Sequence, residues 1–419
     1  MTRSTGVADP IPPRSRSRPS ARALAVLAVL GPGLLAGLSD DDPAGITTYS
    51  VLGAEHGYRL LWVLLLSTVA LMIFHDLGAR MGVVTGQGLI GLIRQRYGVQ
   101  VASAALLALV VANVGTAAAE FAGIAAGSEL LGLSRYVSVP TAAIGVTALV
   151  LLGSFHRVEH WLLALASVFV AYVAAGLLAH PDWDAAASGL LVPRMQFSHT
   201  ETLLVAATVG TTLAPWGLSF IQSYAVDKKL TVQDLRYERV DVLTGATLTG
   251  VIGFFVVVAC AEVLHARGLR IDTASDAAQA LTPVAGHLAS TLFAVGLIGA
   301  ALLAAAVLPL STAYSVCDLT GSPAALDASF GQARLFYLSD IAVTSVAAGL
   351  VLLPDVPLVT VLVSTQTLNA ILLVPLLVAM QLLSRDRDVL GEHTVNRWTS
   401  AAQIVVLAGV LASVAVLLL

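Results

Sequence analysis

Long runs of apolar residues, separated by short polar segments, fill the chain from Ala23 to Leu419. A helix that spans a bilayer needs roughly 20 consecutive apolar residues. Runs of this length predict eleven membrane-spanning helices, some of them long enough to be tilted or broken. Their approximate limits are 23–55, 58–82, 98–131, 137–155, 158–179, 200–226, 240–264, 282–316, 335–353, 357–383 and 398–419. The pattern therefore predicts an all-α integral membrane protein.

The composition excludes a soluble enzyme. Hydrophobic residues make up 57% of the 419 residues, charged residues only 11%, and the mean hydropathy is +0.86. One core cannot bury so much apolar surface, so much of it must face lipid. Two cysteines, Cys260 and Cys317, give neither a disulfide framework nor a cysteine-rich metal site. We expect no cofactor, and no basic stretch with interleaved aromatic residues indicates a nucleic-acid partner.

Basic residues predict how the chain is oriented in the membrane. Residues 1–21 are rich in Pro, Ser and Arg and are expected to be a disordered basic tail, followed by a single transmembrane domain over 22–419. Lys and Arg near span ends stay on the cytoplasmic side. With the N-terminus inside, seventeen of the 22 Lys and Arg residues are cytoplasmic. We therefore expect a multi-pass plasma-membrane protein with a cytoplasmic N-terminus and an extracytoplasmic C-terminus.

Two spans are interrupted by proline at comparable depth. The first break reads Asp42-Pro43-Ala44-Gly45 and the other, five spans later, Ala214-Pro215-Trp216-Gly217. Pro43, Pro215 and Gly217 free backbone groups that lipid cannot satisfy. Matched breaks predict inverted repeats, about 23–179 and 200–383, with a transport site between them and an extra helix at about 398–419. The alternative is that both are ordinary proline kinks.

Carboxylates and amides near these breaks are the candidate metal ligands. A carboxylate inside the membrane is costly unless it is paired, protonated or bound to a cation. Asp42 adjoins freed carbonyls, and this donor set suits a hard divalent cation. Asp40 and Asp41 are expected to line the access path or to cap a half-helix. The further candidates are the carbonyls of Leu213 and Ala214, the amides of Gln222 and Gln366, and Asn369 on the access path, although Gln366 and Asn369 are equally suited to interhelical hydrogen bonds.

Three other ionisable residues within spans are candidates for a proton or ion relay. Glu120 lies in the middle of the third span, with Asn113 two turns before it on the same face. His75 and Asp76 lie in the second span. Intramembrane ionisable groups usually face a polar path, but a structural pair near the cytoplasmic end explains His75 and Asp76 at least as well.

From Gly31 onward the chain resembles the NRAMP family of divalent metal transporters. The resemblance rests on Gly31-Pro-Gly-Leu-Leu-Ala-Gly, Asp42-Pro43, Thr85-Gly86, Glu120 and Gly210-Thr-Thr-Leu-Ala-Pro215. It implies a leucine-transporter-type fold in which broken first and sixth helices hold the metal. The family's Asn ligand is replaced by Gly45, and its Met by Ala214. An all-oxygen site favours Mg²⁺ or Mn²⁺ over softer metals, and the chain is most similar to the magnesium-associated branch.

Further departures from the family's pattern affect the expectation for proton coupling. The resemblance places Ala117 at the family's Asp position on the third helix, and Trp216 and Ile221 at its two His positions on the sixth. We therefore expect an importer of a divalent cation, working by alternating access, with weak or absent proton coupling. The alternatives are a proton-coupled Mn²⁺ or Fe²⁺ symporter that uses Glu120, an amino-acid-like solute transporter of the same fold, and a sensor. The sequence lacks the paired nucleophile and base of an intramembrane enzyme.

Overall fold

A computed structural model of the chain describes residues 36–37, 39–152, 170–196, 198–282, 286–326 and 328–418. Within these residues all regular secondary structure is helical. The α-helices are α3 (Pro43–His56), α4 (Leu61–Thr85), α5 (Leu89–Tyr97), α6 (Val99–Leu130), α7 (Arg135–Leu152), α9 (Val170–Leu178), α10 (Trp183–Leu191), α11 (His199–Thr212), α12 (Pro215–Asp227), α13 (Leu235–Val263), α14 (Ala274–Ala278), α16 (Ala289–Thr320), α17 (Arg334–Val351), α18 (Leu358–Ser384), α19 (Arg387–Leu390) and α20 (Arg397–Leu418). Short 3₁₀ turns are η2 (His265–Arg267), η3 (Gln279–Leu281), η4 (Gly286–Leu288) and η5 (Gly391–His393).

The described helices agree with the spans predicted from the apolar runs. Nine of them are long and apolar enough to cross a membrane when α11 and α12 count as one interrupted span. The predicted spans 23–55 and 158–179 are described only in part, over 36–37, 39–55 and 170–179, which contain α3 and α9. The count of eleven and the structure of the tail over 1–21 therefore stay predictions.

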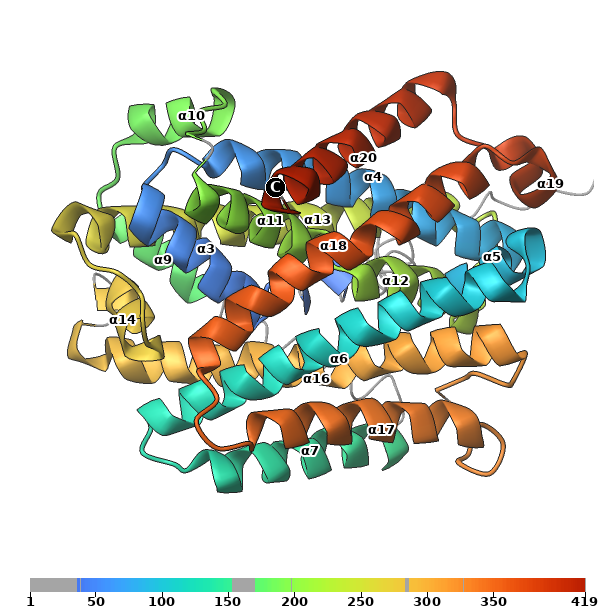
Figure 1. Ribbon diagram of the computed structural model, residues 1–419, viewed down its shortest axis with the longest axis horizontal. Coiled ribbons are helices and arrows are strands. Elements are labelled where there is room, and N and C mark those ends of the chain that lie inside the picture. The colour runs from blue at the N-terminus through green and yellow to red at the C-terminus, as the bar shows by residue number, and fades with distance from the viewer. Residues whose placement is uncertain are drawn as a thin grey trace, which may run out of the picture.

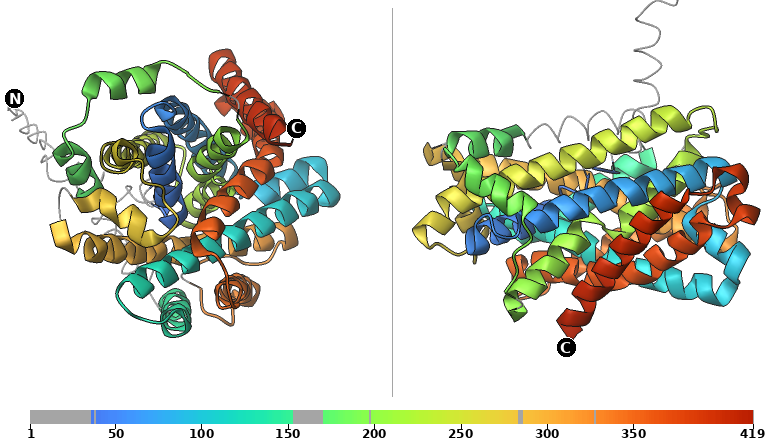
Figure 2. Two further views of the ribbon diagram at one scale, coloured as in Figure 1. Left: turned by 60° about the vertical axis from the view of Figure 1, so that its left-hand side comes forward. Right: turned by 90° about the horizontal axis from the view of Figure 1, so that it is seen from above.

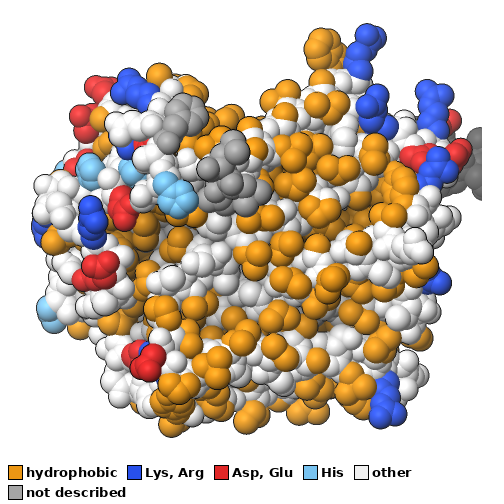
Figure 3. Space-filling model, in the orientation of Figure 1, with side chains coloured by type: hydrophobic (Ala, Val, Ile, Leu, Met, Phe, Trp, Pro, Cys, Tyr) orange, Lys and Arg blue, Asp and Glu red, His pale blue; other side chains and the backbone are white. Residues whose placement is uncertain are grey.

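The long helices run in roughly the same direction, and the charges lie at their ends. Figure 1 shows α7, α16 and α17 side by side along the long axis, with α6, α18 and α20 inclined to it. On the face in Figure 3, hydrophobic side chains form a broad band, and most charged side chains gather at the two ends. This distribution is that of a helix bundle embedded in a bilayer, since a charged side chain is costly at membrane depth.

The interrupted helices lie at the centre of this bundle. In Figure 2, α3 lies inside a ring of other helices, and it contacts α6, α11, α13 and α18. The most apolar part of the α11–α12 span is entirely buried, whereas most of α7 and α20 is left for lipid to cover. The tight packing around α3 depends on glycine, because a Cβ atom at Gly123 of α6 would lie 2.4 Å from the Cβ of Pro43.

Candidate metal site between two broken helices

The first break is organised by Asp42, which caps the N-terminus of α3. Residues 40–42 are not helical, and α3 begins at Pro43, where a missing N–H costs nothing. The Oδ1 atom of Asp42 accepts a hydrogen bond from the Gly45 N–H at 2.6 Å. This bond fixes the carboxylate at the end of the helix, where the helix dipole favours negative charge.

The second break leaves the Leu213 carbonyl without a backbone partner among the described residues. Between α11 and α12, Leu213 and Ala214 have non-helical torsion angles. The N–H of Gly217 bonds to the Ala214 carbonyl at 3.1 Å, but among the described residues the Leu213 carbonyl accepts no backbone N–H. Of the two predicted carbonyl ligands, Leu213 and Ala214, the Leu213 carbonyl is therefore the better candidate.

The two breaks lie against each other. A Cβ atom at Gly45 would lie 2.8 Å from the Asp40 carbonyl oxygen and 3.1 Å from the Thr211 Oγ1 atom. One helix turn further along α3, the Tyr49 hydroxyl is 2.9 Å from the Thr212 Oγ1 atom. No larger side chain fits at position 45 in this conformation, so Gly45 contributes its N–H to Asp42 rather than a side-chain ligand.

Four buried carboxyl groups surround this junction. Asp40, Asp41, Asp42 and Glu120 are each at most 3% exposed. The oxygens of Asp40, Asp41 and Glu120 have no hydrogen-bond partner in the described part of the chain, although the Glu120 and Asp42 carboxyl groups interact directly. Neighbouring carboxylates in a poorly screened interior repel each other strongly. A bound cation would offset this repulsion, so the junction is the candidate cation site.

The ligand chemistry is dominated by oxygen. Within the described ranges no three His, Cys, Asp or Glu side chains are arranged to hold a metal ion. A cation at Asp42 therefore depends on carbonyls, amides or retained water for its remaining ligands. Hard cations accept such ligands, whereas softer transition metals prefer imidazole or sulfur.

Polar side chains of α18 connect to α6 beside this junction. The Nδ2 group of Asn369 donates to the Gln366 Oε1 atom and to the Thr116 Oγ1 atom, both at 2.9 Å. Thr116 lies one helix turn before Glu120. Asn113, one turn earlier still, donates to Thr312 of α16 at 2.8 Å. Asn369 thus forms an interhelical hydrogen bond to the helix that carries Glu120, whereas the hydrogen bonds of the Gln366 side chain to described residues stay within α18.

Gln222 is directed away from the first break. Its Nε2 group donates to the Gln87 carbonyl at 3.0 Å, in the connection between α4 and α5. Eight residues separate it from Ala214 along α12, which corresponds to about 12 Å of helix. In this conformation the structure therefore does not bring Gln222 to Asp42.

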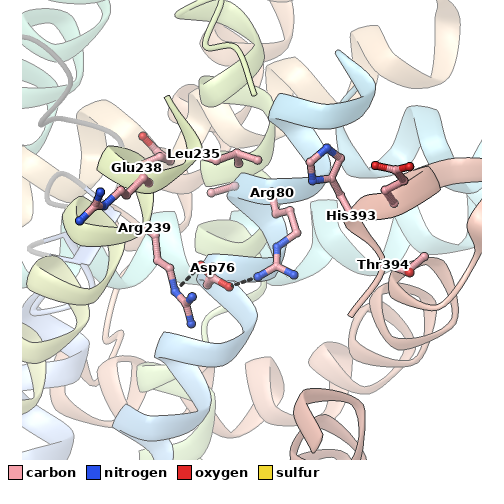
Figure 4. A pocket seen from close by; sticks show the side chains of 10 residues that line it. Asp76, Arg80, Leu235, Glu238, Arg239, His393 and Thr394 are labelled. Atoms are coloured by element: carbon pink, nitrogen blue, oxygen red, sulfur yellow. Dashed lines mark hydrogen bonds and ion pairs between the residues drawn. The ribbon is translucent and has the colours of Figure 1, made fainter. Parts of the chain in front are cut away.

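The two neighbouring relay candidates of α4 have different surroundings. His75 is fully buried, and neither ring nitrogen has a hydrogen-bond partner among the described residues. A Cβ atom at Gly217 would lie 3.3 Å from the His75 Nε2 atom and 3.4 Å from an Asp40 oxygen, so His75 adjoins the junction. Asp76 instead binds Arg80 at 2.7 Å and Arg239 at 3.3 Å (Figure 4). The geometry of Asp76 is that of a structural ion pair.

Figure 4 shows the Asp76 ion pairs beside a cavity of about 380 Å³ between α4, α13 and the α19–α20 connection. Glu238, which also lines the cavity, is buried, and its carboxyl oxygens have no partner among the described residues. Three arginines, Arg80, Arg236 and Arg239, line this cavity together with the carboxylates of Asp76, Glu238 and Glu392. This end of the bundle therefore carries several of the basic residues that the sequence assigns to the cytoplasmic side.

A second polar network closes the α3–α4 connection at the other end. Arg59 forms an ion pair with the buried Glu201 of α11, and it lies 2.9 Å from the His56 Nδ1 atom. The Tyr58 hydroxyl donates to Glu262 of α13 at 2.5 Å. Burial, together with the neighbouring Glu262, raises the pKa of Tyr58 well above its ordinary value. The network ties together the C-terminal ends of α3 and α13 and the N-terminal end of α11.

Sequence reasoning missed Tyr49, Thr211 and Thr116 at the junction. Hydroxyl groups are common within membrane helices, where most of them bond to their own backbone. The signal for Thr211 and Thr212 was their position directly before the proline break. Tyr49 gave no comparable signal, because its partner lies on a different helix.

Comparisons with known proteins identify the family. Residues 33–419 match the model of the natural resistance-associated macrophage protein-like (Nramp) family. The chain belongs to this family. Its members are metal transporters, so the expectations of a multi-pass membrane transporter and not an enzyme are confirmed. The resemblance inferred from the sequence motifs is confirmed as well.

Curated relatives of this Nramp chain cover most of its length. A divalent metal cation transporter, MntH, of Deinococcus radiodurans is 29% identical over 409 residues, covering 92% of this chain and 89% of that protein. The MntH of Burkholderia ambifaria is 27% identical over 382 residues, covering 88% of this chain and 84% of that protein.

Solved structures show the fold of the Nramp chain. A manganese transporter of Eremococcus coleocola superposes with a TM-score of 0.76 at 18% identity, covering 97% of this chain and 87% of that chain. The nucleobase-cation-symport transporter Mhp1 gives a TM-score of 0.53 at 16% identity, covering 92% of each chain. The predicted all-α fold of the leucine-transporter type is confirmed.

Proposed function

We propose that the chain imports a divalent cation, with Mg²⁺ or Mn²⁺ favoured, across the plasma membrane by alternating access and with weak or absent proton coupling. The observation that carries this proposal is Asp42, a buried carboxylate held at a helix break. This break packs against a second one, whose Leu213 carbonyl accepts no backbone N–H among the described residues. The MntH names of the relatives support a divalent metal substrate. A cytoplasmic N-terminus and an extracytoplasmic C-terminus belong to the same proposal.

The preference for a hard cation is supported by the lack of a sulfur ligand at the junction. Ala214 supplies no thioether, and Trp216 is buried with its indole nitrogen unpartnered among the described residues. The remaining ligands proposed for the metal are Asp42, the Leu213 carbonyl, amide oxygens such as that of Gln366, and water. Mg²⁺ retains several waters in most protein sites, so it needs few protein ligands.

Uptake without protons has a sufficient driving force. Moving one charge through a membrane potential of 100 mV is worth about 2.3 kcal/mol, and twice that for a dication. The contact between Glu120 and Asp42 favours a second candidate, a proton-coupled symporter in which Glu120 accepts the proton as metal binds.

Flux into proteoliposomes tests both candidates. Mg²⁺ and Mn²⁺ uptake and internal pH are recorded for the wild type, Asp42→Ala and the control Asp388→Ala, whose carboxylate is 82% exposed. We expect Mg²⁺ uptake without acidification, lost in Asp42→Ala and kept in the control. Acidification that follows metal uptake supports the symporter, and absence of flux for both metals contradicts both candidates.

A further inference from the structure

An apolar groove of about 530 Å³ lies between α4, α11 and α20, outside the metal site. Most of its lining residues are aliphatic or small, and Trp62, Met195 and Gly409 also line it. Leu213 connects the groove to the second helix break, because its side chain lines the groove while its carbonyl lies at the break. No step of transport proposed above uses this space.

The position of the groove is that of a lipid-facing site. It is formed by spans of the bundle, and α20 crosses the neighbouring helices obliquely at the edge of the molecule (Figure 1). Its α20 wall extends over residues 402–416. At 1.5 Å per residue this is about 21 Å of helix, which is comparable to one leaflet of a hydrocarbon core roughly 30 Å thick once the tilt is included.

One end of the groove has the features of a membrane interface. Trp62 begins the α4 wall, and its indole N–H donates to the Arg194 carbonyl at 3.3 Å. Tryptophan prefers the level of lipid headgroups. The Arg194 guanidinium contacts only the Ser188 hydroxyl among the described residues, at 3.4 Å, so a cation is available where phosphate groups lie.

We propose that the groove binds one acyl chain of a phospholipid whose phosphate group lies at Arg194. The charge at its interfacial end favours this occupant over a helix of a second copy, because the Arg194 guanidinium has no carboxylate partner among the described residues and a phosphate group would supply a negative charge. An acyl chain is thin enough to enter, and the lining is mostly apolar.

The test uses Gly409, a glycine of α20 that lines the groove. A Cβ atom at Gly409 meets nothing within 4 Å, so Gly409→Leu fills the groove without a clash and improves helix propensity. Gly349 of α17 is equally open but does not line the groove, which makes Gly349→Leu the matched control. Native mass spectrometry of the purified protein measures binding of added palmitoyl-oleoyl phosphatidylglycerol.

We expect Gly409→Leu to weaken binding of the first lipid at least tenfold and Gly349→Leu to leave it unchanged. Ala412→Phe, a second groove-filling variant, is expected to act as Gly409→Leu does. Arg194→Gln is expected to reduce the preference for phosphatidylglycerol over diacylglycerol, which lacks phosphate.

Wild-type lipid affinity in both groove-filling variants overturns the proposal. A dimer in the wild type that Gly409→Leu dissociates also overturns it, and assigns the groove to a second copy of the chain. An unchanged lipid preference in Arg194→Gln overturns the phosphate contact.

Discussion

The carboxyl group of Glu120 on α6 lies against that of Asp42 at the start of α3, and neither group has an ion pair with a basic side chain in the described part of the chain. At 4 Å and an effective dielectric constant of 20, two like charges repel by about 4 kcal/mol. The pair is therefore stable only with a proton or a cation bound. This contact links the proposed metal ligand to the residue that the sequence analysis assigned to a relay.

Glu120→Gln tests whether this second charge serves metal binding or proton transfer. We expect the Mg²⁺ concentration for half-maximal uptake to rise about tenfold, equivalent to about 1.4 kcal/mol, because one of two adjacent negative charges is lost. Maximal flux stays within a few-fold of the wild type, as measured in proteoliposomes. Glu129→Gln, which alters an exposed carboxylate of the same helix, is the control. If the wild type acidifies the lumen and Glu120→Gln does not, Glu120 is a proton relay and uncoupled uptake is wrong.

The close approach of α11 to α18 depends on Gly210. A Cβ atom there would lie 2.0 Å from the Gln366 carbonyl oxygen, a backbone atom that cannot move without shifting α18. We expect Gly210→Ala to reduce the free energy of unfolding by about 1–3 kcal/mol through overpacking. Thermal unfolding in detergent measures this, with Gly349→Ala as the control because its Cβ atom meets nothing within 4 Å. Equal melting temperatures for the two variants are incompatible with the packing argument.

The ion pair between Arg59 and Glu201 is expected to stabilise the outer end of the bundle. Glu201 is fully buried and also accepts the Gln196 N–H at 2.6 Å, so Glu201→Gln weakens two charge-assisted hydrogen bonds. We expect a loss of about 2 kcal/mol in stability. Glu129→Gln breaks the more exposed pair with Arg135 and is expected to cost less than about 1 kcal/mol. The difference in melting temperature between the two variants checks this expectation, and a larger loss in Glu129→Gln contradicts it.

Much of the fold was predictable because lipid imposes a simple rule on the sequence. Apolar runs of sufficient length located nine described spans, and the proline breaks before α3 and α12 were found at the correct residues. Side-chain contacts between helices were less predictable, because they depend on which helices pack against each other. The sequence did not indicate that Asp76 meets Arg239 of α13, or that Gln222 turns to the Gln87 carbonyl.

Gly45 illustrates the same limit. In the sequence, Gly45 is noticeable only because it stands where the family has an Asn ligand. In the structure its lack of a side chain permits contact with the Asp40 carbonyl and Thr211, and its N–H holds Asp42. Such a role follows from backbone approach between segments far apart in the chain, which no local pattern records.

Ala214 and Leu213 are adjacent in the chain, but one lies at the proposed metal site and the other lines the groove. Substitutions at these two positions therefore test the basis of metal selectivity. Ala214 occupies the family's thioether position, whereas the Leu213 side chain lines the apolar groove. Ala214→Met places a soft sulfur ligand at the break, so we expect Cd²⁺ to compete with Mg²⁺ uptake at a concentration at least tenfold lower than in the wild type. Leu213→Met adds the same sulfur to the groove and conserves volume approximately, so its competition curve should match the wild type. Competition flux assays with both metals measure the shift. Equal Cd²⁺ sensitivity in the two variants would mean that the residue at position 214 does not face the transported ion, and that the preference for a hard cation has another origin.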